Sequence, residues 1–409
     1  MEKMDQLPDV LHFVGVGGIG MSALAQMAAS LGCRTSGSDR ALFSPENARI
    51  MNALRMQGVK LYAQDGSRYA DAPPPAALVY STAIEEDNPD FLKAPSGIPR
   101  LHRSEAMRLL VETCAIPVAA VSGSCGKTTV SAWLAESLDR LGISPTLISG
   151  GLANHFIRNG FAGNYARGCG PLCVLEADES DKSLLNYTAD HAIVLNIGTD
   201  HYSKAELAEV FRSFLRKTRK SAVLEDKVLE MLGPECVEHL EVALFSTDPA
   251  APETLHGRKV FRVTDYAVSP EGGSVRIDGV RFRLPAPGLH NAANAAAVTA
   301  SLFLLGCDRA KLREAEESFS GVWRRFDFAG RNENGTAVYD DYAHNVEKIA
   351  SCMKSARELC PGRVLFVFQP HGYGPLGFMR KELYPALEEA MGPEDLFGFL
   401  PVYYAGGTT

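Results

Sequence analysis

Short apolar runs alternate with longer stretches of helical periodicity along most of the chain. The runs are four to six residues long, continuous and often followed by glycine, which is typical of strands buried in a parallel sheet. They lie at 11–16, 77–81, 116–121, 172–176 and 192–196. Helix-like segments at 21–31 and 128–141 follow two of them directly. This alternation predicts an α/β protein with mostly parallel sheets covered by helices.

Three domains are expected from the way this alternation is interrupted. We place the divisions after residues 111 and 321, which gives units at 1–111, 112–321 and 322–409. The first two resemble a Rossmann-like unit and a larger nucleotide-binding unit with a mostly parallel sheet, and the third a short Rossmann-like unit. Within the second, the β-branched and glycine-containing stretch 260–284 predicts an antiparallel excursion.

Composition and charge narrow the protein class. The 409 residues are 46% hydrophobic and 22% charged, which excludes a disordered chain. Lys plus Arg number 41 against 49 for Asp plus Glu, so we expect no general nucleic-acid partner. Neither a membrane span nor a signal peptide is visible, and the nine scattered cysteines are typical of free thiols in a reducing compartment. We therefore expect a cytoplasmic protein without a membrane partner.

The first candidate for chemistry is the glycine loop Gly15-Val16-Gly17-Gly18-Ile19-Gly20, which follows a strand and opens a helix. Such glycines let the backbone approach a diphosphate at the helix N-terminus. Asp39 follows Gly20 by 19 residues, where an acid that binds ribose would lie. A nicotinamide dinucleotide is compatible with this loop alone, and so are glycines needed only for packing.

A second loop, Ser122-Gly123-Ser124-Cys125-Gly126-Lys127-Thr128-Thr129, resembles a P-loop. Val121 stands where the full pattern has its first glycine, so this is a shorter variant. Backbone N–H groups and a lysine around phosphates, with a hydroxyl for Mg²⁺, predict a nucleoside triphosphate site.

Carboxylates gather after the next strand, in Glu176-Ala177-Asp178-Glu179-Ser180-Asp181. The carboxyl edge of an open sheet is where ligands bind, and one carboxylate together with phosphates can hold Mg²⁺. The alternative is a solvated acidic loop. His201, which follows a further strand, is as compatible with a loop residue as with a metal ligand.

Together these segments resemble the Mur ligase family. The resemblance extends from residue 11 to the end of the chain. Besides the three segments above, it rests on His290-Asn291-Ala292-Ala293-Asn294, Arg324-Arg325-Phe326, Asp340-Asp341-Tyr342-Ala343-His344 and Phe368-Gln369-Pro370-His371, all in the family's order.

This resemblance implies what each domain does. It assigns a UDP-sugar to 1–111, ATP to 112–321 and an amino acid to 322–409, which disfavours the nicotinamide interpretation. The implied reaction is ATP-dependent formation of an amide bond between UDP-N-acetylmuramate and L-alanine through an acyl phosphate, in peptidoglycan precursor synthesis. ATP and two Mg²⁺ ions are implied, and a protein nucleophile is not needed.

The resemblance also implies a set of site residues, grouped here by role. Catalytic residues are Lys127, His201 and Arg325. ATP-binding residues are Gly123, Ser124, Cys125, Gly126, Lys127, Thr128, Thr129, Asn291, Asn294, Arg325 and Asp340. The resemblance implies that the ATP ribose is contacted by Asp340 or by its neighbour Asp341. UDP-sugar-binding residues are Gly15, Gly17, Gly18, Ile19, Gly20, Ser38, Asp39 and Ser81. Amino-acid-binding residues are Tyr342 and His344, and metal ligands are Thr128, Glu176 and His201.

Departures from the family pattern leave alternatives open. Ser124-Cys125 replaces Thr-His, and Gly372 and Pro375 stand where arginines would clamp an amino-acid carboxylate. The identity of the amino donor is therefore left open. One alternative is a ligase of the same family that uses another amino acid or a peptide. The other is a non-catalytic relative that binds a nucleotide. The third domain has room for about three strands, at 336–341, 363–369 and 395–401, so we expect it to be incomplete. Whether it is naturally short or truncated is left open, and the oligomeric state is not predicted.

Overall fold

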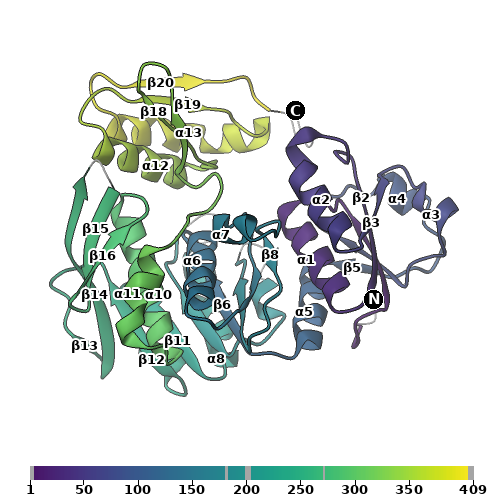
Figure 1. The fold of residues 1–409 in the computed structure, drawn as a ribbon, viewed down its shortest axis with the longest axis horizontal. Coiled ribbons are helices and arrows are strands. Elements are labelled where there is room, and N and C mark those ends of the chain that lie inside the picture. The colour runs from purple at the N-terminus through teal and green to yellow at the C-terminus, as the bar shows by residue number, and fades with distance from the viewer. Residues whose placement is uncertain (1–3, 180–182, 199–203, 270–271, 404–409) are drawn as a thin grey trace.

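The structure is a computed structural model that describes residues 4–179, 183–198, 204–269 and 272–403. It consists of three units that follow one another along the chain (Figure 1). The central unit, teal and green, borders both the purple N-terminal unit and the yellow C-terminal unit. The α/β architecture with mostly parallel sheets is confirmed.

The N-terminal unit is a parallel sheet in the order β3-β2-β1-β4-β5. Strand β1 buries Leu11 and Phe13 in one apolar cluster and Val14 in another, which explains why its apolar run is nearly continuous. The strands are β1 (Val10–Val14), β2 (Arg34–Asp39), β3 (Lys60–Ala63), β4 (Ala77–Tyr80) and β5 (Arg100–His102). The helices are α1 (Ile19–Ser30), η1 (Pro45–Asn47), α2 (Ala48–Met56), α3 (Arg68–Asp71), α4 (Pro89–Leu92) and α5 (Arg103–Cys114).

The central unit has an eleven-stranded sheet among the described residues, in the order β16-β15-β14-β12-β11-β10-β6-β9-β7-β8, with β13 paired to β14. The strands are β6 (Val118–Ser122), β7 (Thr146–Ile148), β8 (Tyr165–Ala166), β9 (Cys173–Glu176), β10 (His191–Val194), β11 (Ser221–Glu225), β12 (Glu241–Ser246), β13 (Thr254–Leu255), β14 (Arg258–Ser269), β15 (Gly272–Ile277) and β16 (Val280–Leu284). The antiparallel excursion expected at 260–284 is confirmed as β14-β15-β16, which extends the parallel sheet at its edge.

Helices cover both faces of this sheet. Ala-rich α10 has little side-chain bulk, so it lies buried and close to α6, β12 and β14. The helices are α6 (Lys127–Arg140), α7 (Asn154–Arg158), η2 (Ser183–Leu185), α8 (Lys204–Lys217), α9 (Asp226–Leu232), η3 (Pro234–Val237), α10 (Leu289–Leu304) and α11 (Arg309–Glu317).

The C-terminal unit contains two separate strand pairs and two helices. They are β17 (Asp327–Arg331), β18 (Ala337–Asp340), α12 (Val346–Leu359), β19 (Leu365–Phe368), α13 (Tyr373–Ala390) and β20 (Leu396–Phe399). The strands expected in this Rossmann-like unit at 336–341, 363–369 and 395–401 correspond to β18, β19 and β20, but they do not form one sheet. Instead β18 pairs with β17 through the tight turn 332–335, and β19 pairs with β20. The local hairpin has the lower loop-closure cost.

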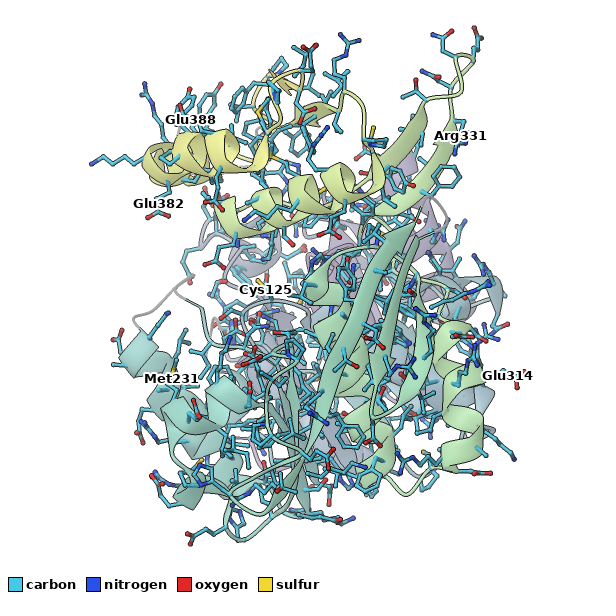
Figure 2. All side chains as sticks on the ribbon, turned by 90° about the vertical axis from the view of Figure 1, so that its left-hand side faces the viewer. Cys125, Met231, Glu314, Arg331, Glu382 and Glu388 are labelled. Carbon is cyan, nitrogen blue, oxygen red and sulfur yellow. The ribbon has the colours of Figure 1, made fainter. Side chains whose placement is uncertain are left out.

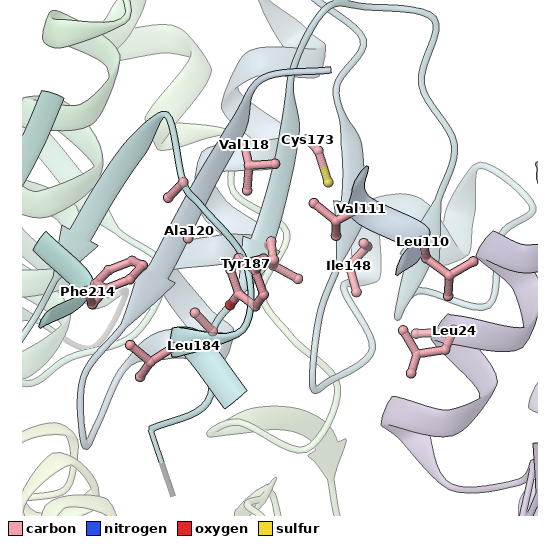
Figure 3. Close-up of a cluster of buried hydrophobic side chains, with 14 of the residues drawn as sticks. Leu24, Leu110, Val111, Val118, Ala120, Ile148, Cys173, Leu184, Tyr187 and Phe214 are labelled. Atoms are coloured by element: carbon pink, nitrogen blue, oxygen red, sulfur yellow. The ribbon is translucent and has the colours of Figure 1, made fainter. Parts of the chain in front are cut away.

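One apolar core runs from the N-terminal unit into the central unit. Figure 3 shows Leu24 of α1 and Leu110 of α5 facing Ile148 of β7, and the same cluster continues to Phe214 of α8. The C-terminal unit instead has its own small cluster around Met353, Phe368 and Leu383, whose members all come from that unit.

A buried hydrogen-bond network reinforces this first joint. The fully buried amide of Asn164 donates to the Ile19 carbonyl and the Ser22 hydroxyl, both at 2.7 Å, and accepts from Gln26 at 3.2 Å. All three partners belong to α1. Because buried polar groups are costly when unpaired, this network fixes α1 on the central unit.

All nine cysteines lie in the described residues and are free thiols, as expected. None of the helices in the described part of the chain combines the length and apolar character that crossing a bilayer requires.

Glu316 is a fully buried carboxyl group on α11 that no site residue contacts. Its Oε2 atom lies 2.8 Å from the hydroxyl of Thr299, which also donates to the Ala295 carbonyl at 2.9 Å. Oε1 has no partner in the structure. One hydroxyl proton cannot serve both acceptors, so a protonated Glu316 that donates to Thr299 satisfies the geometry. Burial raises the pKa of Glu316 to about 8, although the Thr299 hydrogen bond opposes the shift.

We predict that Glu316→Gln stabilises the protein in a pH-dependent way. Folding raises the pKa of Glu316 from its ordinary 4.5. The protonated carboxyl group therefore contributes its full share of the unfolding free energy below pH 4.5, and this contribution is lost as the pH rises towards 8. The neutral amide does not titrate. Urea unfolding at pH 8 should show a gain in unfolding free energy on the order of a few kcal/mol, which shrinks at pH 5.

The exposed Glu314 on the same helix provides the matched control. In Glu314→Gln, the difference between the unfolding free energies at pH 5 and pH 8 should be the same as in the parent chain. A gain from Glu316→Gln that is equal at both pH values would contradict the assignment of this proton.

Candidate functional site

A glycine loop between β6 and α6 forms the centre of the site. Gly123 and Gly126 have φ angles of 136° and 90°, which L side chains rarely adopt. A Cβ on Gly126 would lie 2.5 Å from Oδ1 of Asn294, so the turn also needs glycine for space. The predicted P-loop therefore has its expected setting, after a buried strand and at the start of a helix.

Asn196, which sequence reasoning did not select, holds this loop in place. Its side-chain amide accepts from the backbone N–H of Cys125 at 2.8 Å and donates to the Cys125 carbonyl at 3.0 Å. Gly198 N–H donates to the Ser124 hydroxyl at 2.7 Å. A polar residue two positions after β10, the neighbour of β6, was the signal that could have identified it.

Lys127 lies in the first turn of α6 with its ammonium largely buried. Its Nζ donates to Glu179 Oε2 and to the Gly123 carbonyl, both at 2.8 Å, and Glu179 is itself only 4% exposed. Burial lowers the pKa of Lys127, but the carboxylates of Glu179 and Glu176 outweigh it and the net shift is upward. The lysine is therefore charged and its charge is balanced by Glu179.

Thr128 and Glu176 meet beside this pair. The Thr128 hydroxyl donates to Glu176 Oε1 at 3.0 Å, and Glu176 Oε2 accepts from Gly150 N–H at 2.7 Å. A hydroxyl and a carboxylate next to a phosphate loop are hard oxygen donors, which fits Mg²⁺. No group of three His, Cys, Asp or Glu able to hold a metal occurs among the described residues, so such an ion would need phosphate or water ligands. His201, the third expected ligand, lies outside the described residues.

A cleft of about 870 Å³ lies between the central and C-terminal units. It opens in front of the loop 122–129, the predicted phosphate-binding loop, which is called the phosphate loop below. Figure 2 shows Cys125 of the loop at the end of the central unit that faces the C-terminal helices. The structure brings most predicted ATP and metal residues to its wall. They are Ser124, Cys125, Gly126, Lys127, Thr128, Thr129, Glu176, Asn291, Asn294 and Arg325.

Two predicted ATP residues are placed differently. Gly123 does not line the cleft but accepts from Lys127 through its carbonyl. Asp340 lies outside the lining, with Oδ2 3.1 Å from Nε of Arg324. Its neighbour Asp341 does line the cleft, and its carboxylate accepts from Phe326 N–H at 2.7 Å. Successive residues leaving a strand point in opposite directions, and the sequence pattern did not resolve which of the pair faces the cleft.

Arg325 projects into the cleft from the segment that connects the central and C-terminal units. The residues on either side, Arg324 and Phe326, have φ angles of 57° and 48°. Bulky residues in this left-handed region are strained, and such strain is found where surrounding contacts fix a functional side chain. Here the Tyr342 N–H donates to the Arg324 carbonyl at 2.8 Å, which ties the segment to the end of β18.

Tyr342 and His344, the predicted amino-acid residues, lie beside the cleft and not in its lining. The Tyr342 ring lies 5.2 Å from that of His344 and 5.6 Å from that of His371. The guanidinium groups of Arg324 and Arg325 lie 5.5 and 5.9 Å from the same ring. The arrangement is an aromatic cluster with cations at one edge.

The first glycine loop forms a second site on the N-terminal unit. Gly15 and Val16 N–H groups donate to the Ser38 carbonyl at 2.8 and 2.9 Å, and Gly17 N–H donates to Asp39 at 2.7 Å. A Cβ on Gly17 would overlap the Asp39 carboxylate. The predicted residues Gly18, Ile19 and Gly20 cap and begin α1, and Ser81 directly follows β4.

Ser38 and Asp39 have structural partners that the sequence did not reveal. The Ser38 hydroxyl is buried and donates to the buried carboxylate of Asp90. Both Asp39 carboxylate oxygens accept backbone N–H groups, from Gly17 and from Ala41. These two residues shape the loop whatever ligand it takes.

One arginine lies at the joint between the first two units, close to both the first glycine loop and the acidic segment. Arg103, at the start of α5, lies 3.2 Å from Asp178 in the acidic segment after β9. A Cβ on Gly20 would lie 3.5 Å from the same guanidinium. A cation thus stands between the first glycine loop and the acidic segment.

Family models match nearly the whole chain in three consecutive segments. The Mur ligase family catalytic domain matches 10–113, the Mur ligase middle domain 121–302, and the Mur ligase glutamate ligase domain 324–391.

Two similar relatives are the UDP-N-acetylmuramate–L-alanine ligases of a Chelativorans species and of Sinorhizobium medicae. They are 34% and 32% identical to this chain over 426 and 421 residues. The matches cover 99% of the chain in both cases, and 85% and 84% of the relatives.

Solved structures agree with this relationship. The UDP-N-acetylmuramate–alanine ligase of Thermotoga maritima superposes with a TM-score of 0.75 at 26% identity, covering 97% of this chain and 94% of that chain. A murein peptide ligase from Psychrobacter arcticus has the same fold, with a TM-score of 0.71 at 20% identity over 96% of this chain and 90% of that chain. The chain belongs to the Mur ligase family.

Proposed function

We propose that this chain is an ATP-dependent ligase that joins L-alanine to UDP-N-acetylmuramate in peptidoglycan precursor synthesis. The observation that carries the proposal is the cleft in which Lys127, Thr128 and Glu176 of the central unit face Arg325 from the C-terminal connection. Family membership and the names of relatives at 32–34% identity support the choice of substrates.

The proposed chemistry needs positioning and charge stabilisation more than a protein nucleophile. A carboxylate oxygen of the acceptor attacks the γ-phosphorus of ATP, and ADP leaves. The amine nitrogen then attacks the acyl carbon, the C–N bond forms, phosphate leaves, and the nitrogen loses a proton. Lys127 and Arg325, which both line the cleft, are proposed to neutralise negative charge on the phosphoryl group being transferred.

Mg²⁺ is proposed as the accompanying cation, held by Thr128 and Glu176. When bound, it would neutralise phosphate charge and orient the phosphoryl group. A second ion and its ligand His201 stay predictions. The protein's own part here is to present the two oxygen donors beside the phosphate loop, 3.0 Å from each other.

The domain roles are proposed as follows. Residues 1–111 bind the UDP-sugar through the first glycine loop and Asp39. Residues 112–321 bind ATP, with Asn291 and Asn294 at the adenine. Residues 322–409 bind the amino acid through Tyr342 and His344. The ribose contact expected from Asp340 fits its neighbour Asp341 better, because Asp341 lines the cleft. A cytoplasmic location and the absence of a nucleic-acid partner stay predictions.

A different amino donor is the second candidate, and one observation favours it. Gly372, where an arginine was expected, is the N-cap of α13, and its N–H donates to the Tyr403 carbonyl. It offers no cation for an amino-acid carboxylate. Arg324 and Arg325, whose guanidinium groups lie over the Tyr342 ring, are cations near the aromatic cluster.

We predict phosphate release when the protein is given ATP, Mg²⁺, UDP-N-acetylmuramate and L-alanine together, and little without any one of them. The assay should include all twenty amino acids and an L-alanyl peptide, with mass spectrometry of the product. Release with a peptide but not with L-alanine would replace the first candidate by the second. No release with any donor, from a protein that binds ATP, would refute both.

We also predict that Lys127→Ala abolishes phosphate release and lowers stability. The loss of turnover follows from removal of the phosphate-binding ammonium, and the loss of stability from leaving Glu179 buried without its partner. Adding Glu179→Gln should restore the thermal midpoint but not turnover. Recovery of turnover in this double variant would show that Lys127 does not serve the phosphates.

A further inference from the structure

One face of α12 in the C-terminal unit lies against the turn that begins α10. Ser351, Ser355 and Glu358 are spaced by four and three residues, so they share this face of the helix. Ser351 Oγ lies 3.2 Å from Nδ1 of His290, and the Ser355 hydroxyl donates to the Pro287 carbonyl at 3.4 Å. The C-terminal unit therefore contacts the segment in which the adenine residues are proposed.

The third contact is a relay through Tyr266 of strand β14. Gly288 N–H donates to the Tyr266 hydroxyl oxygen at 2.6 Å, and this hydroxyl donates to the carboxylate of Glu358. The three residues come from a central turn, a central strand and a C-terminal helix. Such a chain polarises each of its hydrogen bonds, so it is stronger than two isolated ones.

Gly288 gives this relay its functional position. It has a φ of 110° and is the N-cap of α10, on which Asn291 and Asn294 follow within two turns. Ser351 and Ser355 of α12 line the same cleft as Asn291. The relay thus fixes the start of the proposed adenine helix and at the same time the C-terminal wall that faces it.

The Tyr266 hydroxyl remains a hydrogen-bond donor over the whole neutral range. Its burial and the neighbouring Glu358 carboxylate raise the pKa of the phenol well above its ordinary value. A phenylalanine at this position would keep the ring and lose only the two hydrogen bonds.

We propose that Tyr266 is a positioning residue that couples nucleotide binding on α10 to the seating of the C-terminal unit through Gly288 and Glu358. This proposal rests on the proposed function for the identity of the two ligands. When the relay is intact, α12 is held in the wall of the cleft, and the C-terminal unit keeps the proposed amino-donor residues Tyr342 and His344 beside that cleft.

The test is Tyr266→Phe in the full chain. Because a net hydrogen bond contributes modestly to stability, KM for ATP and KM for the amino donor should both rise about three- to tenfold. The value of kcat at saturation should change by less than about twofold, since the reacting groups are untouched. Tyr384→Phe, at an exposed position on α13, is the matched control.

A double-mutant cycle tests the relay itself. Glu358→Ala should raise both KM values as Tyr266→Phe does, and the double variant should be no worse than the worse single variant. Glu358→Gln keeps an acceptor oxygen and should recover most of the affinity lost in Glu358→Ala. Additive effects, or a lower melting temperature with unchanged KM values, would overturn the proposal.

A binding measurement separates this proposal from the proposed function. Calorimetric titration with MgATP needs no turnover, and Tyr266→Phe should weaken binding about three- to tenfold. If the parent chain binds MgATP but ligates no donor, the ligase assignment fails while the relay is still tested. Equal affinity in parent and variant would refute the relay even in an active enzyme.

Discussion

The joint between α1 and the central unit constrains the whole site. The amide of Asn164 is buried completely, and its hydrogen bonds go to α1, the helix that opens from the first glycine loop. The apolar cluster that spans the same joint adds to these bonds, because opening the joint would expose its side chains to water. The first glycine loop and the phosphate loop consequently keep a fixed relation. A reaction between a UDP-linked acceptor and a triphosphate benefits from this rigidity, because both reactants are then presented at a set distance.

The C-terminal unit is attached by contacts of another kind. Its apolar cluster is its own, and α12 meets the central unit through the serine, histidine and tyrosine hydrogen bonds already described. Each of these hydrogen bonds, including the buried one from Ser355, contributes a net free energy of about 1 kcal/mol, far less than an apolar core shared between the units would contribute. The wall of the cleft that carries Arg325 is therefore held to the central unit less firmly than the N-terminal unit is, and the strained backbone at Arg324 and Phe326 lies at its connection.

Most of the fold and the phosphate loop followed from the sequence, because buried parallel strands, glycine turns and helix starts leave local patterns. The continuous run of β1 and the loop before α6 are examples. The rest depends on contacts between distant residues: Lys127 with Glu179, Asn196 with Cys125, and Tyr266 with Glu358, which are 92 positions apart. The pairing of β18 with β17 was not predicted either, because the alternation of apolar and polar residues in β18 fits a partner strand on either side. No periodicity encodes which of Asp340 and Asp341 turns into the cleft.

The acidic segment after β9 illustrates why residue type alone could not assign roles. Glu176 and Glu179 look equivalent in the sequence, yet Glu176 meets a hydroxyl and a backbone amide, whereas Glu179 neutralises Lys127 in a largely buried pair. A buried ammonium without a counter-charge would be strongly destabilising, so this carboxylate is required before any nucleotide arrives. Phosphates that enter the loop must then compete with a carboxylate for the lysine, which favours ligands that carry several negative charges and bring their own cation. The pairing of the lysine would thus contribute to selecting a triphosphate as much as the glycines would.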